Sequence, residues 1–195
     1  MNKNIELSEV VILWGIDKAV QSLKNELKSK KIIVINPNEI IDLDSVDLHV
    51  KVKEQGDVFL AVMLSRFLFI SDMLDIEFLD KYAKEYEEFY DFTQSFRIVL
   101  TLQKIGLDTI VIKNILELID GKKTTIITGK GVSGQVEADD VKDSINALGI
   151  LLGLFDKDGS GVFHLDKDGY QSGYDLSSGE FEFIDEIDVD ILKEM

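Results

Sequence analysis

The sequence predicts an α/β fold: a Rossmann-like, mainly parallel sheet flanked by helices, with a loop-rich acidic C-terminal tail. Two continuous apolar runs, Val10–Trp14 and Ile32–Ile35, indicate strands buried on both faces, which is typical of parallel sheets. Apolar residues at helical spacing lie between them: Ala19, Val20, Leu23 and Leu27. Strand, helix and strand in this order predict one right-handed βαβ unit.

A third strand and a buried helix are predicted next. Residues 46–52 alternate between apolar and polar side chains, which indicates a half-exposed strand near a sheet edge. Val58–Ser71 is a strongly apolar helix that contains Arg66. Its apolar run is shorter than the roughly 20 residues that a membrane-spanning helix needs. We therefore expect a core helix and no direct membrane insertion.

Helices dominate the middle of the chain. One is predicted to start near Asp75, with its apolar side formed by Ile76, Leu79, Tyr82, Tyr86, Phe89 and Tyr90. Such an aromatic stripe favours the core over a cofactor site. Gly106 separates a short helical segment from a helix at Asp108–Ile119, which Asp120-Gly121 should end.

The last predicted βα unit begins with the β-branched strand Thr124–Thr128. That strand enters the glycine-rich segment 129–134, and a helix follows from about Val136 to Leu154. After Phe155 the chain is rich in Gly, Asp and Ser, with few apolar anchors. We therefore expect an α/β domain at residues 1–165 and a loosely packed acidic tail at 166–195.

Charge and composition narrow the classes of partner and site. Asp plus Glu number 37 against 21 Lys plus Arg, and the net charge of −16 repels nucleic acid and anionic lipids. A basic partner protein is compatible with such a surface. The absence of cysteine excludes disulfides, thiolate zinc sites and cysteine-ligated iron–sulfur clusters within this sequence. The N-terminus has no apolar signal core.

The segment Gly129-Lys130-Gly131-Val132-Ser133-Gly134 matches the dinucleotide-binding pattern G-x-G-x-x-G between a strand and a helix. Two features oppose a phosphate site there. Carboxylates crowd the start of the helix: Glu137, Asp139 and Asp140. The helix also leads into FDKDGSG, with no second strand predicted to end in an acidic residue. A tight turn before a helix whose dipole stabilises these carboxylates is the favoured interpretation.

Other sequence patterns that could carry chemistry are incomplete. Asp156, Asp158, Ser160 and Gly161 imitate an EF-hand loop, but its twelfth place is Lys167 and not glutamate. His49, on the polar side of its strand, and His164, in the acidic loop, have no metal-ligand spacing. Ser133 lies in GVSGQ, which fails the nucleophile-elbow pattern. We therefore predict no catalytic residue and no metal ligand.

Several segments together resemble the nucleotide-binding α/β domain of the molybdopterin oxidoreductase superfamily. VVILWGIDKAV resembles its strand followed by Trp-Gly and Asn-Pro-Ala, and IIVINPNEIIDLDSVDLHVKVKEQGD resembles its Asp-Pro-Arg, "ADLHL" and Gly-Thr-Asp steps. KTTIITGKGV and NALGILLGLFDKDGSGVFHL resemble the later strand and helix. The order holds over residues 9–165. Within the superfamily, the chain is most similar to the large iron–sulfur subunit of bacterial NADH-quinone oxidoreductase (an NADH dehydrogenase, respiratory complex I), notably through LSRFLFISDMLDIEFLDKYAKEYEEFYDFTQSFRI.

The chain departs from the active members at the positions that help them hold a guanine-dinucleotide pterin. Asp17-Lys18-Ala19 stands for Asn-Pro-Ala, Asn36-Pro37-Asn38 for Asp-Pro-Arg, and Gln55-Gly56-Asp57 for Gly-Thr-Asp. The lost arginine and the added Asp17 disfavour an anionic cofactor. The surviving matches are Gly15, Gly56 and Asp57, each of which also has a turn or cap explanation.

The resemblance implies a structural, cofactor-free domain of that large iron–sulfur subunit, which supports electron transfer to quinone without catalysing a reaction itself. It implies iron–sulfur clusters in an N-terminal part outside this sequence, peripheral-arm subunits as partners, and a cytoplasmic position peripheral to the inner membrane. The sequence would then be an excised domain of a longer subunit. The alternatives are a partial catalytic domain of a molybdenum or tungsten oxidoreductase, such as a formate dehydrogenase, and a stand-alone nucleotide-binding module that uses residues 129–134.

Overall fold

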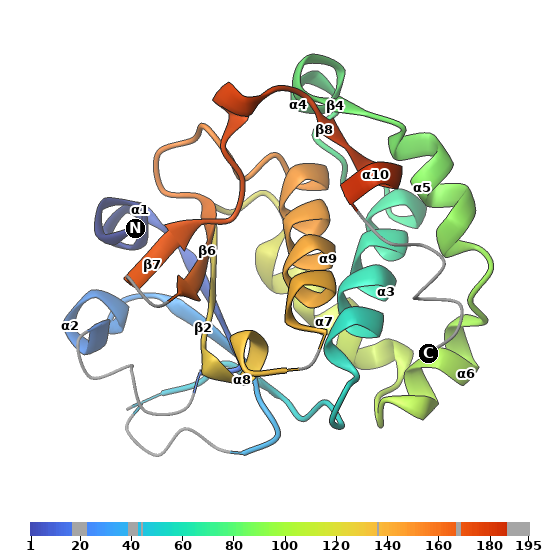
Figure 1. Cartoon of the computed structure of the whole chain (residues 1–195). Coiled ribbons are helices and arrows are strands. Elements are labelled where there is room, and N and C mark those ends of the chain that lie inside the picture. The colour runs from blue at the N-terminus through green and yellow to red at the C-terminus, as the bar shows by residue number, and fades with distance from the viewer. Residues whose placement is uncertain (17–22, 39–42, 44, 136, 167–168, 187–195) are drawn as a thin grey trace.

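The computed structural model of the chain describes residues 1–16, 23–38, 43, 45–135, 137–166 and 169–186 (Figure 1). Its main sheet has six strands in the order β3-β2-β1-β5-β6-β7. Their bounds are β1 Val10–Trp14, β2 Lys31–Ile35, β3 Leu48–Val50, β5 Thr124–Thr128, β6 Gly161–Asp166 and β7 Gly169–Ser172. All neighbouring pairs are parallel except β6 with β7. The predicted α/β fold with a mainly parallel sheet is thus confirmed, and β3 lies at an edge as expected.

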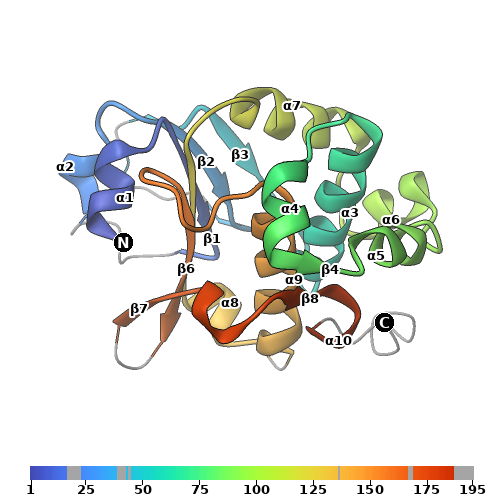
Figure 2. The same cartoon turned by 90° about the horizontal axis from the view of Figure 1, so that it is seen from above.

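The sheet is covered on both faces, as the continuous apolar strands require (Figure 2). Val11, Leu13 and Ile127 pack with α1 (Asn2–Leu7) and α2 (Lys24–Leu27) on one face. The alternate residues Ile12 and Trp14 join a larger core on the other face. That core contains α3 Asp57–Ile70, α7 Thr109–Ile119 and α9 Ala138–Leu151. Strand periodicity therefore assigns each side chain to one of two cores.

Helix α3 is a buried core helix, as predicted. Most of its residues from Asp57 to Leu68 are buried, and it packs mainly against α9. Arg66 is half-buried and donates from Nη1 to the carbonyl oxygens of Thr93 (3.1 Å) and Phe96 (2.5 Å). The cation thus binds carbonyls at and just after the C-terminal end of α5 (Tyr86–Thr93), where the helix dipole favours positive charge. Within the described residues, no helix is long and apolar enough to cross a membrane.

The single helix predicted after Asp75 is wrong, because the chain breaks it into two. Helix α4 (Ile76–Tyr82) ends at β4 (Ala83–Lys84), and Glu85 takes a left-handed conformation with φ +62° before α5 starts. Strand β4 pairs with the distant β8 (Phe181–Glu182), a long-range contact that helical spacing does not reveal. Phe89 is buried as predicted, whereas Ile76 is exposed.

The Gly106 boundary and the end of the next helix are confirmed. Helix α6 (Ile98–Lys104) precedes Gly106, and α7 begins after Asp108, whose carboxylate accepts from the amides of Ile110 and Val111. Gly121 follows α7 with φ +63°, the left-handed conformation expected after a helix C-terminus.

Residues 156–180, expected to be loops, contain two strands of the main sheet. β6 pairs with β5 through Val162 and Phe163, and β7 folds back onto β6. The expectation that no strand follows α9 is therefore wrong. Strand β6 was not predicted because residues 156–180 have a low apolar content. A buried histidine, His164, occupies a core position of this strand.

The described part of segment 166–195 contacts the rest of the domain. It contains β7, the 3-10 helix η2 (Leu176–Ser178), β8 and α10 (Phe183–Glu186). Phe181 and Phe183 are buried, and the Phe183 ring stacks on Phe89 with centroids 5.1 Å apart. Lys84 also pairs with Glu180 at 2.5 Å. These contacts fasten residues 180–186 across α5 (Figure 1).

Candidate functional site

A crevice of about 330 Å³ lies at the carboxyl ends of the parallel strands. Its walls come from the segments that follow four of them: Gly15 after β1, Asn36 and Pro37 after β2, 52–55 after β3 and the glycine loop after β5. Strand order reverses between β1 and β5. In open α/β sheets, ligands bind at this reversal point, so the crevice is the candidate functional site.

Gly15 joins the segments around the crevice through its backbone. Its amide donates to the carbonyl oxygen of Ile35 at 2.8 Å, and its own carbonyl oxygen accepts from the Gly131 amide at 2.7 Å. The backbone at Gly15 has φ +62°, and a β-carbon there would lie 2.8 Å from the Val132 nitrogen. The close crossing of two loops at this point explains why the residue is glycine. This explanation does not involve a ligand.

Asp57 is the charged group buried in the crevice wall. It opens helix α3 and is 8% exposed. Trp14 donates from Nε1 to one carboxylate oxygen at 2.6 Å, and Gln135 donates from Nε2 to the other at 2.8 Å. Gln135 also donates to the Gly131 carbonyl at 2.7 Å. Asp57 therefore ties α3 to β1 and to the loop before α9.

The electrostatics of Asp57 fit a structural acceptor. Burial raises the pKa of its carboxyl above the ordinary value, and the hydrogen bonds from Trp14 and Gln135 oppose that rise. Its position in the first turn of α3 places the negative charge where the helix dipole favours it. Both oxygens are already engaged by side chains of the same chain, so the carboxylate is held without a ligand.

We expect Asp57→Ala to lower the free energy of unfolding by about 1–3 kcal/mol, because the buried Trp14 indole N–H would lose its acceptor. Asp57→Asn keeps an oxygen for Trp14, but its amide nitrogen cannot accept from Gln135, so it should cost about 1 kcal/mol, less than Asp57→Ala. Urea unfolding followed by the fluorescence of Trp14, the single tryptophan, measures both. Equal losses for the two variants would contradict the acceptor role.

The glycine-rich segment 129–134 forms the predicted tight turn before a helix. The Gly129 and Gly131 amides donate to the carbonyls of Trp14 and Gly15, and the amides of Val132 and Ser133 donate to that of Gly129. A β-carbon on Gly129 or Gly131 would lie 2.7 or 2.8 Å from the Gly15 oxygen. These glycines allow two backbones to meet, and the four amides named here donate within the chain.

The charge of the crevice opposes an anionic ligand. Among the described residues, Glu54, Asp57 and Glu137 line it together with one cation, Lys53. An adjoining hollow of about 200 Å³ shares Lys53, Glu54, Gln55 and Glu137, and adds Phe59, Ile105 and Lys104. Within the part of the chain that the structure describes, carboxylates outnumber lysines by three to two over the two hollows together. Phosphate groups would be repelled from the inner part.

The three matches to the superfamily have different positions. Gly15 and Asp57 both line the crevice, whereas Gly56 packs behind it, where a β-carbon would lie 2.8 Å from the Val52 side chain. Asn38, which stands for the family's arginine, is exposed and outside the crevice lining. Asp17, Lys18 and Ala19 lie outside the described residues.

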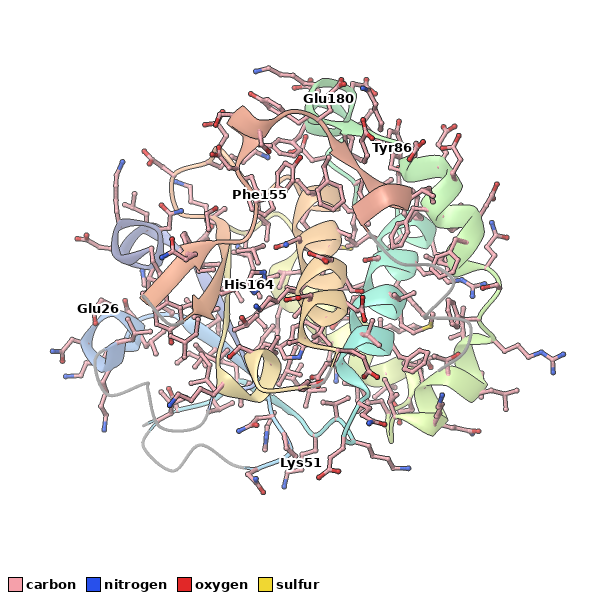
Figure 3. The ribbon with its side chains drawn as sticks, viewed as in Figure 1. Glu26, Lys51, Tyr86, Phe155, His164 and Glu180 are labelled. Atoms are coloured by element: carbon pink, nitrogen blue, oxygen red, sulfur yellow. The ribbon has the colours of Figure 1, made fainter. Side chains whose placement is uncertain are left out.

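His164 lies in the interior and not in a loop, a correction to the sequence prediction (Figure 3). Its Nε2 donates to the Asn146 side-chain oxygen and its Nδ1 accepts from the Thr128 hydroxyl, both at 2.8 Å. Burial, aided by the charge of Lys142, lowers its pKa to about 4. Sequence reasoning missed this network because its three members lie on β5, α9 and β6. The apolar residues around His164 in GVFHL were the local signal that could have indicated a buried strand there.

The remaining sequence candidates have structural roles. His49 is half-buried at the sheet edge, with Nε2 2.9 Å from the Asn36 carbonyl oxygen. Asp158 pairs with Lys3 at 2.7 Å, and the Ser160 carbonyl accepts from Asn4 at 2.6 Å, so the loop is fastened to α1. Ser133 Oγ lies 3.4 Å from the Gly129 carbonyl. Over the described part of the chain, no three His, Cys, Asp or Glu side chains are placed to hold a metal ion.

The fold and the crevice define a parallel α/β domain of the type that binds ligands at a strand-order reversal. Among solved structures it resembles acetylene hydratase from Pelobacter acetylenicus, with a TM-score of 0.57 and 16% identity, over 76% of this chain. The match covers 21% of that chain, so the present sequence spans about a fifth of its length. At this level of identity the likeness shows a shared α/β fold. No family model and no curated protein matches the sequence.

Proposed function

We propose that this chain is a structural domain with the α/β core of a molybdopterin oxidoreductase and no pterin cofactor, as part of the large iron–sulfur subunit of a NADH-quinone oxidoreductase. The fold likeness to part of a molybdopterin enzyme supports the superfamily. The sequence resemblance over residues 9–165 favours the large subunit of complex I. The domain would support electron transfer to quinone by holding the shape of the subunit, without a redox centre of its own.

One observation carries the cofactor-free assignment: the polar groups in the wall of the crevice at the strand-order reversal are bonded within the chain, and its carboxylates oppose a phosphorylated ligand. Asp57 is bonded on both oxygens by Trp14 and Gln135, and the glycine-loop amides donate to backbone carbonyls. Glu54 and Glu137 add negative charge at its edge. A pyrophosphate would meet carboxylates where it needs amides and cations.

The position in a larger assembly is part of the same proposal. The partners would be other peripheral-arm subunits of complex I, and iron–sulfur clusters would be held by an N-terminal part of the parent subunit. The assembly would lie on the cytoplasmic side of the inner membrane, peripheral to it. The chain covers only a fifth of the acetylene hydratase chain, which is consistent with one domain of a larger protein.

Titration with GDP tests the crevice directly, because GDP carries the guanine and pyrophosphate groups of a guanine-dinucleotide pterin. We expect no saturable heat signal up to about 1 mM GDP, since the inner crevice repels phosphate. Glu137→Lys, which reverses one charge at the half-buried crevice edge, should give weak binding that disappears at high salt. Micromolar binding by the unmodified chain would contradict the proposal and favour the nucleotide-binding or catalytic alternatives.

A further inference from the structure

The connection between helices α4 and α5 is extended, although its sequence favours a helix. It consists of Ala83, Lys84 and Glu85, which we call the joint. Alanine, lysine and glutamate are among the best helix formers and are depleted in strands. Ala83 and Lys84 nevertheless form β4, and Glu85 has φ +62°, a left-handed conformation that is costly for a glutamate. The local sequence and the observed backbone therefore disagree at these three residues.

The charges on both sides of the joint are spaced for one continuous helix. Opposite charges four residues apart stabilise a helix. Two such series run from α4 through the joint: Glu77, Lys81 and Glu85, and Asp80, Lys84 and Glu88. In the observed structure α4 ends at Tyr82, and Lys84 pairs with Glu180 at 2.5 Å and with Glu182 at 3.7 Å. Lys84 thus has one set of acidic partners in the strand and would have another in a helix.

Residues 180–186, which we call the strap, hold the joint in its extended form. Strand β8 of the strap pairs in parallel with β4 of the joint, and the two lie side by side in Figure 1 and Figure 2. Phe181 lies opposite Ala83, and the ring of Phe183 stacks on Phe89 of α5. The strap therefore contacts both the joint and the helix that follows it. A strained backbone such as that of the joint persists where the surrounding structure holds it, and it is common in switch regions.

We propose that the joint is a two-state element whose conformation is set by the strap. While the strap is docked, residues 83–85 are extended and α4 and α5 are separate helices. When the strap is released, the pairing with β8 is lost, residues 76–93 form one helix, and α5 changes its direction relative to α4. The bonds from Arg66 to the end of α5 also favour the bent form, so the strap has to supply only the remaining difference in free energy. This inference goes beyond the proposed function and does not depend on the absence of a cofactor.

Charge reversal on the strap tests the proposal without altering the joint. Glu180→Lys combined with Glu182→Lys places like charges against Lys84 and should loosen the strap. In the 195-residue chain with isotope-labelled alanine, we expect the nuclear magnetic resonance signal of the Ala83 α-carbon to move downfield, from the extended to the helical range. Chymotrypsin should cleave after Phe183 roughly tenfold faster, because cleavage of this buried residue requires an open strap.

Two further variants separate the switch from a general effect of charge or stability. Glu6→Lys combined with Glu117→Lys makes the same charge change at exposed positions of α1 and α7, and should change neither the Ala83 signal nor the cleavage rate. Glu85→Gly, added to the charge-reversed strap, should leave cleavage fast but return Ala83 to a non-helical signal. Glycine accepts the left-handed backbone and disfavours a helix, so it should keep the joint bent.

Phe181→Asp loosens the strap by a second route, because a charged side chain without a partner is not retained at a site that is 1% exposed. If circular dichroism shows that this variant does not fold, the charge-reversed strap decides the question. The proposal is overturned if Ala83 stays extended in a folded variant that is cleaved faster, or if no folded strap variant is cleaved faster. It is also overturned if Glu85→Gly leaves the Ala83 signal helical. GDP binding tests the proposed function separately from these measurements.

Discussion

Gly15→Ala is expected to lower the free energy of unfolding by about 2–5 kcal/mol, the largest effect we predict for a single methyl group. A left-handed backbone costs a non-glycine residue about 1–2 kcal/mol, and overpacking adds about 1–3 kcal/mol. The added β-carbon would lie 2.8 Å from the Val132 nitrogen and 3.0 Å from the Gly131 carbonyl carbon. Both neighbours are backbone atoms and cannot rotate away.

Gly121→Ala is the matched control for this substitution. Gly121 has φ +63°, against +62° at Gly15, but a β-carbon there would have no neighbour within 4 Å. Gly121→Ala should therefore lower the free energy of unfolding only by the cost of the left-handed backbone, about 1 kcal/mol. Urea unfolding measures the loss of unfolding free energy in both variants. The difference between the two losses is the part caused by the close contact of the two loops at Gly15. Equal losses would show that the contact between Gly15 and the glycine loop does not hold the crevice wall.

The second large effect is an acid destabilisation centred on His164. Its pKa is about 4 in the folded chain, and about 6.5 is the ordinary value for an unfolded one. The unfolded state therefore binds more protons between these values, so stability is fully present above about pH 6.5 and declines as the pH falls toward 4. The loss should reach about 2 kcal/mol by pH 5 and about 3 kcal/mol below pH 4.

His164→Gln isolates this contribution from the carboxylates that also titrate. Glutamine can donate to Asn146 and accept from Thr128 as the histidine does, and it carries no charge at any pH. The unfolding free energy of the native chain, minus that of the variant, should decrease by about 2 kcal/mol between pH 7 and pH 5. A difference that does not change with pH would contradict a neutral, buried His164.

Local sequence patterns predicted most of the secondary structure. The runs at Val10–Trp14 and Thr124–Thr128 indicated buried strands because parallel strands between two helix layers are apolar on both faces. The short apolar run of α3, which Arg66 interrupts, predicts a core helix and not a membrane-spanning one. Such elements are set by side chains near one another in sequence.

Two errors came from contacts between distant segments. The break between α4 and α5 depends on pairing of β4 with β8, where Ala83 lies beside Phe181. Strand β6 was missed because its buried polar residue, His164, is satisfied by Thr128 and Asn146. Neither contact leaves a periodic signal in the local sequence.

Sequence reasoning named Gly15, Gly56 and Asp57 only as matches to the superfamily and predicted no catalytic or metal site. The sequence pointed to Gly15 and Asp57, and the structure places both at the crevice. It did not reveal that Trp14 and Gln135 occupy the Asp57 carboxylate, or that Gly131 contacts the Gly15 carbonyl. A G-x-G-x-x-G pattern describes a tight turn before a helix, and only its tertiary contacts show whether a phosphate or another backbone approaches it.

The metal and pterin content of the full-length protein tests the central claim most directly. The protein should be purified from its own cells, analysed for molybdenum and tungsten by mass spectrometry, and assayed for pterin by the fluorescence of its oxidised form. The cofactor-free assignment predicts neither metal in stoichiometric amount and no released pterin. One molybdenum or tungsten per chain, together with a pterin, would contradict it and favour the catalytic alternative.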